Sequence, residues 1–182
     1  MVAQQDFIPS PYDSAIFICH TSTGITLILL YVDNMIITSD DSAGIRDLQK
    51  FLSQHFEMKD LGTLSYILDL KVTSSSDGYY LSQAKYASDL LSKVGLINSK
   101  TVFTPLELNV KLNATDGESL LDATLYRQLV GNLIYLIVTC LDLAYAVHLV
   151  SQFMSAPHST HYAAVLHILR YIKRMLFHGL HF

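Results

Sequence analysis

Short apolar runs separated by turn-forming residues dominate the N-terminal part of the chain. Apolar types are concentrated in Ala15 to Thr21, in Ile25 to Val32 and in Met35 to Thr38. Residues 22–24 separate the first two runs, and Asp33-Asn34 separates the last two, so this pair is a candidate two-residue turn. The pattern predicts three consecutive antiparallel strands.

A helical period follows these strands. Asp41 and Ser42 are suited to cap a helix, and the next apolar residues lie on one helical face: Ile45, Leu48, Phe51 and Leu52. Alternation returns over Leu64 to Thr73, residues 74–78 have the composition of a turn, and Tyr79 to Leu81 can pair back. We therefore expect a helix and then a second hairpin.

The C-terminal half has helical periodicity. A helix is predicted from Gln83 to Val94, with Ser82 as its N-cap and Gly95 at its left-handed end. Residues 97–118 contain turn-forming residues and scattered apolar positions, which predicts an extended connector. Three more helices are expected, capped by Asp122 (Ala123 to Ile137), by Asp142 (to Met154) and by Ser159 (to Met175).

Composition and charge favour a folded intracellular domain. With 182 residues, 51% of them hydrophobic, the chain can bury a core, and strands followed by helices indicate the α+β class. The formal net charge of -4 weighs against strong autonomous binding of DNA or RNA, because nucleic-acid binders usually carry a basic surface. Met1 to Pro11 has neither a basic leader nor an apolar signal region, so an intracellular location is expected, in cytoplasm or nucleus.

Two further features favour simple structural roles. Cys19 and Cys140 form no CxxC pattern and are expected to be reduced core thiols. Leu129 to Val150 is long enough for a membrane span, but it contains Asn132, Asp142 and His148. Two packed helices explain this stretch better, and a membrane span is the alternative.

Two groups of polar residues are candidates for chemistry. Asp33 either forms part of a tight turn or projects from a hairpin tip as a Mg²⁺ ligand, and spacing alone does not distinguish these. His158, His161 and His167 suggest a metal site, but no carboxylate or thiol completes the set. A helix start and an exposed helix face are the simpler explanation for these histidines.

Several separated blocks resemble the reverse transcriptase of copia-type LTR retrotransposon Pol polyproteins. They are LLYVDN from Leu29, FEMKDLG from Phe56, LSQAKYASDLL from Leu81 and YRQLVGNLIYL from Tyr126. The stretch from Ala144 and the closing LFHGLHF from Leu176 are similar to the segment that joins the polymerase to its ribonuclease H domain. The blocks follow the family's order and cover nearly all of residues 7–182.

The resemblance implies three regions. Residues 1–96 would form a partial palm, an antiparallel sheet with helices on one face that carries the catalytic hairpin. Residues 97–121 would be an extended connector, and residues 122–182 a helical thumb and connection region leading toward a missing ribonuclease H domain. The fingers and the first palm strand are expected ahead of Phe7, so the chain is expected to be catalytically inactive alone.

The resemblance also implies a site. In that family the hairpin ends in two aspartates, which with an upstream carboxylate hold two Mg²⁺ ions. Here these positions are Asp33, the implied metal ligand, and Asn34, a degenerate catalytic position. Tyr31 would support the hairpin, and Lys59 lies where related polymerases have a lysine near the leaving phosphate, although a solvated surface lysine is the alternative. Mg²⁺, weakly bound or absent here, is the implied cofactor, and an RNA/DNA template-primer, weakly bound, is the implied partner.

Other positions depart from the family's pattern. Gly is usual where Asp69 stands, an Arg-Pro pair where Cys140-Leu141 stand, Gly-Thr where Arg174-Met175 stand, and a basic residue where His167 stands. Asp69 is expected in a buried strand, where it would need a partner or solvent. The departures indicate drift from an active RNA-directed DNA polymerase. The alternative function is a non-catalytic palm-thumb remnant that binds nucleic acid or intact polymerase.

Overall fold

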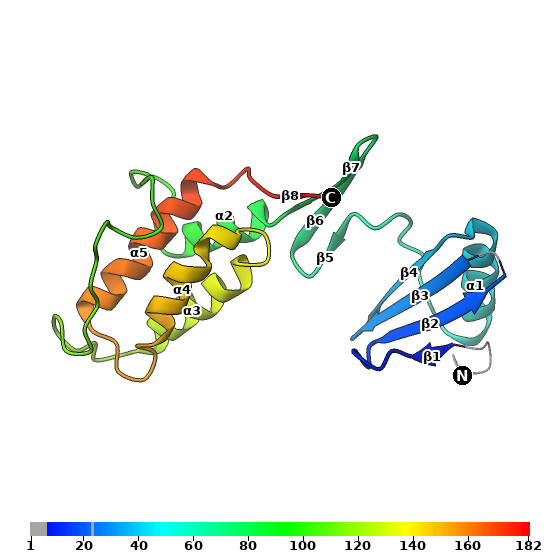
Figure 1. Ribbon diagram of the computed structural model, residues 1–182, viewed down its shortest axis with the longest axis horizontal. Helices are drawn as coiled ribbons and strands as arrows, with labels where there is room; N and C mark the ends of the chain where they lie inside the picture. Colours follow the sequence, from blue (N-terminus) through cyan, green and yellow to red (C-terminus); the bar gives the residue numbers. More distant parts are fainter. Residues whose placement is uncertain (1–6, 23) are drawn as a thin grey trace. The chain divides into compact units, whose positions relative to one another are not determined.

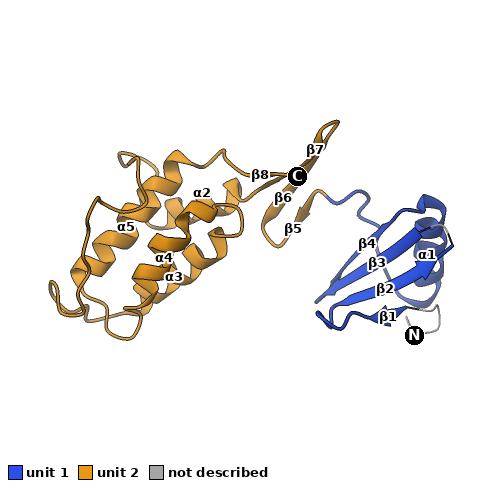
Figure 2. Ribbon diagram, viewed as in Figure 1, with its two compact units in different colours: residues 1–64 blue, residues 65–182 orange. Residues whose placement is uncertain are grey.

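The computed structural model describes residues 7–22 and 24–182 and confirms the α+β class. The chain divides into two compact units, Met1–Leu64 and Ser65–Phe182 (Figure 2). The polar segment preceding Phe7 and Thr23 of the predicted interruption lie outside the described residues. The functional subdivision into residues 1–96, 97–121 and 122–182 stays a prediction.

The first unit is an antiparallel sheet with one helix packed on it (Figure 1). Its strands follow chain order: β1 (Ile8–Pro9), β2 (Ile16–Thr21), β3 (Gly24–Tyr31) and β4 (Asn34–Ser39). Helix α1 (Ser42–His55) supplies Leu48 and Leu52 to a core that also contains Phe7, Cys19 and Ile28. The predicted strands are therefore confirmed.

Helix α1 begins as its sequence predicts. The carboxylate of Asp41 accepts a hydrogen bond from the amide of Ala43 at 2.8 Å, which satisfies one of the free N–H groups at the helix start. Alternate residues of β3 face the helix, so Ile28 is fully buried while Ile25 and Tyr31 are exposed.

The second unit begins with another antiparallel sheet, whose strands are β5 (Tyr66–Ile67), β6 (Leu70–Ser75), β7 (Gly78–Ser82) and β8 (Leu180–His181). The predicted strand from Leu64 to Thr73 is wrong as one element, because Leu68 and Asp69 form a two-residue turn within it. Both have positive φ, 48° and 57°, as a type I′ hairpin turn requires. The closing segment of the chain pairs with β7.

The helices of the second unit surround the larger core. They are α2 (Ala84–Lys93), α3 (Thr124–Leu136), the short 3₁₀ helix η2 (Leu141–Leu143), α4 (Ala144–Ser151) and α5 (Ser159–Arg174). Fully buried side chains from α3 and α5, among them Leu129, Leu133 and Ile168, form its centre. Residues 97–121 run beside this core without helix or strand and insert Val102 and Leu106 into its margin.

The N-caps of α2, α3, α4 and α5 differ from the predicted ones, and that of α2 is Gln83 rather than Ser82. Asp142 does not open a helix to Met154; it lies in η2 and accepts a hydrogen bond from the Tyr171 hydroxyl of α5. The N-cap of α5 is His158 rather than Ser159. The N-cap of α3 is Ala123 rather than Asp122, although the Asp122 carboxylate accepts a hydrogen bond from the amide of Thr124 at 2.7 Å.

The long apolar stretch from Leu129 to Val150 is divided between α3, η2 and α4, as expected for packed helices. Within the described part of the chain, the helices fall short of the length and apolar character needed to cross a membrane.

Candidate functional site

The candidate hairpin is closed by the cross-strand pair Tyr31 and Asn34. The two-residue loop is therefore Val32-Asp33, and the sequence prediction of an Asp33-Asn34 turn is wrong by one residue. Cross-strand pairing of the apolar residues on β3 and β4 sets this register, because a shift by one would turn every side chain to the other face.

Val32 is the first loop residue and has φ of 49°. A positive φ at this position alone matches a type II′ turn, which normally places glycine there. Valine is β-branched and is a genuine outlier in this region, so the loop holds backbone strain at the tip of the hairpin.

The register also determines where the site residues point. Tyr31 and Asn34 are directly paired, and the next row on the same face pairs Leu29 with Ile36. This face lies opposite the one that packs on α1, whose rows contain Ile28. Asp33 is exposed at the loop, and Tyr31 and Asn34 are exposed beside it.

The potential metal ligands of the hairpin do not fit a pair of Mg²⁺ ions. Asp33 offers one carboxylate and Asn34 one neutral carbonyl oxygen, whereas Mg²⁺ prefers near-octahedral oxygen coordination with carboxylates. Within residues 7–22 and 24–182, no three His, Cys, Asp or Glu side chains lie where they could hold one metal ion.

Lys59 lies in the first unit, exposed in a stretch without helix or strand that follows α1. No ion pair joins it to a carboxylate among the described residues. Its implied role beside a leaving phosphate stays a prediction.

Asp69 is not in a buried strand, contrary to expectation. It is exposed at the second position of the β5–β6 turn, where its carboxylate accepts a hydrogen bond from the Tyr66 hydroxyl at 2.7 Å. This bond, followed by slight desolvation, raises the pKa of Tyr66 above its ordinary value. A glycine, which the resemblance implies at this position, would adopt this positive φ easily.

The three histidines serve as local structural groups. His161 is fully buried, contrary to the expectation of an exposed face; it stacks on Phe153 at 3.8 Å between ring centroids. Its Nδ1 accepts from the amide of His158 at 2.9 Å and its Nε2 donates to the carbonyl of Asn113 at 3.0 Å. His167 donates from Nε2 to the carbonyl of Thr104.

The remaining departures from the family's expected pattern are Cys140-Leu141 and Arg174-Met175, which lie near the ends of α3 and α5. Burial and then the hydrogen bond to Asp142 raise the pKa of Tyr171 to about 12. Leu141 is exposed, and the Arg174 guanidinium lies 4.1 Å from the ring centroid of Phe103. Arg174, the last residue of α5, therefore packs on an aromatic face.

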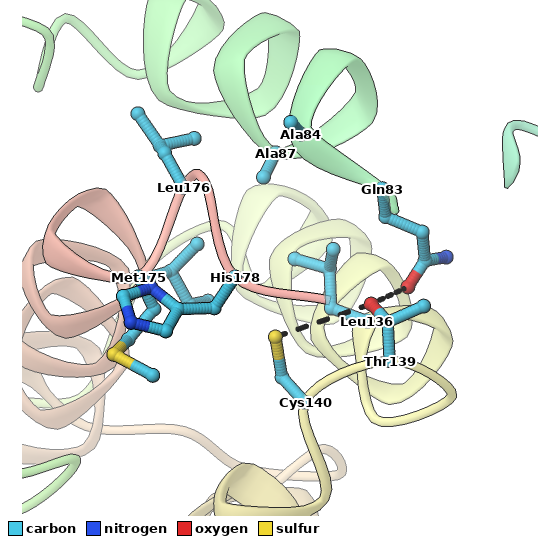
Figure 3. Close-up of a pocket in the computed structure, with 10 residues that line it drawn as sticks. Gln83, Ala84, Ala87, Leu136, Thr139, Cys140, Met175, Leu176 and His178 are labelled. Atoms are coloured by element: carbon cyan, nitrogen blue, oxygen red, sulfur yellow. Dashed lines mark hydrogen bonds between the residues drawn. The ribbon is translucent and has the colours of Figure 1, made fainter. Parts of the chain in front are cut away.

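A small cavity of about 10 Å³ lies between α2, α3 and the segment after α5 (Figure 3). Gln83 and Thr139 are buried beside it and are joined by a hydrogen bond of 2.7 Å. Burial raises the pKa of the Cys140 thiol. Neither cysteine is in a disulfide within the described residues; Cys19 is buried, and Cys140 is half-buried rather than a core residue. The cavity has room for about one water molecule and no larger ligand.

Sequence reasoning missed one group of residues. Tyr66, Lys71 and Lys85 line an open hollow of about 380 Å³ in the second unit. The sequence carries no signal for it beyond the lysines themselves, because the register of two short strands brings Tyr66 and Lys71 opposite each other.

Comparison with known proteins was made on the whole sequence. The family described as "Reverse transcriptase (RNA-dependent DNA polymerase)" matches residues 1–108. The chain is 37% identical over 174 residues to "Retrovirus-related Pol polyprotein from transposon RE1" of Arabidopsis thaliana, covering 96% of this chain and 12% of that protein. No solved structure matches significantly.

Two other relatives are similar at the same level. "Retrovirus-related Pol polyprotein from transposon TNT 1-94" of Nicotiana tabacum is 37% identical over 156 residues, covering 81% of this chain and 12% of that protein. "Uncharacterized mitochondrial protein AtMg00810" of Arabidopsis thaliana is 37% identical over 155 residues, covering 85% of this chain and 64% of that protein. The chain thus spans about one-eighth of the length of the Pol polyproteins it matches.

Proposed function

Since the chain belongs to the reverse transcriptase family of copia-type retrotransposon Pol polyproteins, we propose that it forms the hairpin-bearing and helical part of an RNA-directed DNA polymerase. The observation that supports this most directly is the closed hairpin, with Asp33 exposed at its loop and Tyr31 paired with Asn34. In this role Asp33 is the one catalytic carboxylate that the hairpin supplies.

Asn34 makes the site weaker than its relatives' sites. Reverse transcriptases generally use Mg²⁺, which supplies charge neutralisation at the transferred phosphate. The amide of Asn34 offers an oxygen without negative charge, so the hairpin presents less negative charge to a bound metal ion. If the missing negative charge lowers transition-state stabilisation by about 3 to 4 kcal/mol, the rate of catalysis falls by a factor of several hundred.

Binding of an RNA/DNA template-primer by this chain is proposed to be weak and independent of sequence. Acidic residues outnumber basic ones, 16 to 12, so long-range attraction to phosphate is small. Affinity of this kind falls steeply with salt.

A fusion tests the catalytic proposal. A family-typical fingers and first palm segment is joined ahead of Phe7, and primer extension on an RNA template is measured with Asn34 and with Asn34→Asp. We expect substantial extension only from Asn34→Asp, with the Asn34 form slower by at least about a hundredfold.

The control for this test is Asn34→Ser in the same fusion, which keeps a neutral side chain and should stay as slow as Asn34. Equal extension by the Asn34 and Asn34→Asp fusions would show that the hairpin position does not limit catalysis. An inactive Asn34→Asp fusion that folds would contradict the assignment of Asp33.

A non-catalytic role is the second candidate, and the sheet face opposite α1 favours it. That face carries half-buried apolar residues: Ile16, Ile18, Leu27, Leu29 and Ile36. Such a surface suits association with an intact polymerase copy. Sedimentation of the chain mixed with an intact copia-type polymerase tests this: Leu27→Lys should abolish association, whereas Ser53→Lys on the exposed side of α1 should not.

A further inference from the structure

Side chains of α5 hold the extended connector by its backbone carbonyls. Residues 99–117, called the strap below, run along this helix without helix or strand of their own (Figure 1). Five side chains of α5 and its N-cap donate to strap carbonyls: Lys173 to Ser99, His167 to Thr104, His161 to Asn113, Thr160 to Asp116 and His158 to Gly117. Three of these donors are histidines, the side chains that change charge between about pH 5 and 8.

The Asn113 end of the strap requires a neutral histidine. His161 is fully buried, its Nε2 donates to the Asn113 carbonyl, and its Nδ1 accepts from the His158 amide at 2.9 Å. A second proton on the ring would have to lie on Nδ1, where an N–H group already points. The charged ring therefore cannot keep both hydrogen bonds.

The strap and the helix start supply no counter-charge for this ring. On α5, it faces the ring of His158, 5.7 Å away between centroids, which would carry the same positive charge. In the strap, Asp116 directs its carboxylate to the backbone and side-chain amides of Asn113, and Glu118 beyond it is exposed. No ion pair joins His161 to a carboxylate within the part of the chain that the structure describes.

The segment after α4 supplies no anion either. Residues 152–157 contain no charged side chain, and Phe153 stacks on the His161 ring. Arg127 of α3 reaches the same segment, where its guanidinium donates to the carbonyl of Met154. A proton on His161 would therefore be a buried charge without a partner, which costs free energy.

The Thr104 end of the strap responds to acid in the opposite direction. His167 donates from Nε2 to the Thr104 carbonyl, and its Nδ1 lies 3.9 Å from a carboxylate oxygen of Glu107. A proton added at Nδ1 keeps the first bond and adds attraction to Glu107. The side chain of Glu107 is 77% exposed, so this gain is small, but it has the sign that holds the strap in place.

We propose that the strap is a pH-responsive element, which detaches from α5 at its Asn113 end as His161 gains a proton and stays attached at its Thr104 end. Detachment uncovers the first turn of α5 and the ring of Phe153, so pH controls access to that surface. This property goes beyond the proposed polymerase function and does not depend on it.

The direction of the pH dependence follows from the neutral ring of the attached state. A solvated histidine side chain gains its proton near pH 6.5, so the detached state binds one more proton than the attached state below that value. Attachment is strongest above about pH 6.5, and detachment becomes more favourable by up to about tenfold for each pH unit below it.

Amide hydrogen exchange of the full chain tests the proposal, followed by NMR at pH 7.5 and 5.0 and expressed as protection relative to an unstructured chain. The Leu120 amide donates to the Pro157 carbonyl beside the helix start, and the Val110 amide donates to the Glu107 carbonyl near the other end. Protection of Leu120 should fall about ten- to thirtyfold between the two pH values, whereas protection of Val110 should change by less than about twofold.

His161→Gln separates the proton from the hydrogen bond. Glutamine can donate to the Asn113 carbonyl but does not titrate, so protection of Leu120 should be lower than in the unchanged chain at pH 7.5 and should stay constant to pH 5.0. His148→Gln is the matched control, because His148 is exposed on α4 and bonds Gln152 rather than the strap. That variant should keep the full pH dependence.

A second measurement needs no substitution in the buried site. The ring ¹⁵N shifts of His161 should show the neutral form with its proton on Nε2 at pH 7.5, and this signal should disappear in parallel with the protection of Leu120. In His167→Gln, which cannot gain charge beside Glu107, the pH dependence at Leu120 should be unchanged.

Three results overturn the proposal. Equal loss of protection at Val110 and Leu120 would show that acid unfolds the whole region instead of one end of the strap. Constant protection of Leu120 to pH 5.0 in the unchanged chain would show that the attached end accepts the proton. A pH dependence that persists in His161→Gln would assign the response to another group.

Discussion

Val32 places a β-branched side chain at a φ of 49° in the loop of the candidate hairpin. We predict that Val32→Gly stabilises the chain by about 0.5 to 1 kcal/mol, because glycine relieves about 1 to 2 kcal/mol of left-handed strain and loses part of that gain as chain entropy. Urea unfolding followed by circular dichroism measures the difference. Val32→Ala keeps a Cβ and should gain less; an equal gain would show that the strain is not at this backbone position.

Tyr126 gives a pH-dependent prediction. Burial raises its pKa to about 12, and its hydroxyl donates to the carbonyl of Val150 at 2.6 Å. Because the folded-state pKa lies above the unfolded value of about 10, the associated stability is full below pH 10 and is lost as pH rises through 12. Tyr126→Phe should therefore be less stable by about 1 to 3 kcal/mol at pH 7, and this deficit should shrink between pH 10 and 12.

The measurement is thermal or urea unfolding at several pH values, comparing the chain with Tyr126→Phe. Tyr171, whose pKa is also about 12, is present in both proteins and cancels in the difference. Tyr12→Phe is the control, since Tyr12 is 97% exposed and its substitution should change the stability little. A deficit of Tyr126→Phe that stayed constant to pH 12 would contradict the buried hydroxyl.

At the scale of elements, the β5–β6 hairpin carries the next prediction. Asp69→Gly should stabilise the second unit by about 0.5 kcal/mol, because φ of 57° suits glycine better than aspartate. The same substitution removes the carboxylate that raises the pKa of Tyr66, so that pKa should fall toward its ordinary value. Unfolding experiments and NMR titration of the Tyr66 ring measure the two effects.

Asp69→Asn separates these effects, since asparagine tolerates a positive φ and carries no charge. It should lower the pKa of Tyr66 and change the stability little. A Tyr66 pKa that stayed raised in both variants would mean that the hydrogen bond to Asp69 is not its main cause.

The elements that sequence reasoning predicted correctly are those that local chemistry determines. Helix α1 follows from its apolar stripe and the Asp41 cap, and α2 ends at Lys93, shortly before Gly95, which has φ of 70°. The errors in the strands and hairpins are at turns that lack the usual residues. Leu68-Asp69 and Val32-Asp33 contain no glycine or asparagine, so the pairing of flanking strands, rather than turn propensity, sets their positions.

At the scale of the whole molecule, the candidate site depends on contacts that no local pattern encodes. The position of Asp33 was predictable, because the hairpin that bears it consists of adjacent segments. Two other features were not predictable, because each requires segments distant in sequence to pack together. They are the hydrogen bond between Asp142 and Tyr171 and the hollow between Tyr66 and Lys85. The resemblance to a family implied a chemistry for the hairpin but carried no information about these two long-range contacts.

The last prediction concerns the chain of 182 residues without any fused segment. Asn34→Asp should not give it primer extension on an RNA template with Mg²⁺ and four nucleotides, although the substitution recreates the family's paired carboxylates. Two neighbouring carboxylates supply only some of the oxygens that two octahedral ions need, and catalysis also requires a surface that positions the nucleotide.

Without metal, the new charge beside Asp33 should instead destabilise the first unit by a few tenths of a kcal/mol, an effect that salt screens. Primer extension against a mock purification and urea unfolding at low and high salt measure the two effects, with Asn34→Ser as the uncharged control. Extension above the mock level would show that the catalytic set lies elsewhere than at this hairpin, and a loss of stability that salt does not reduce would show that repulsion from Asp33 is not its cause.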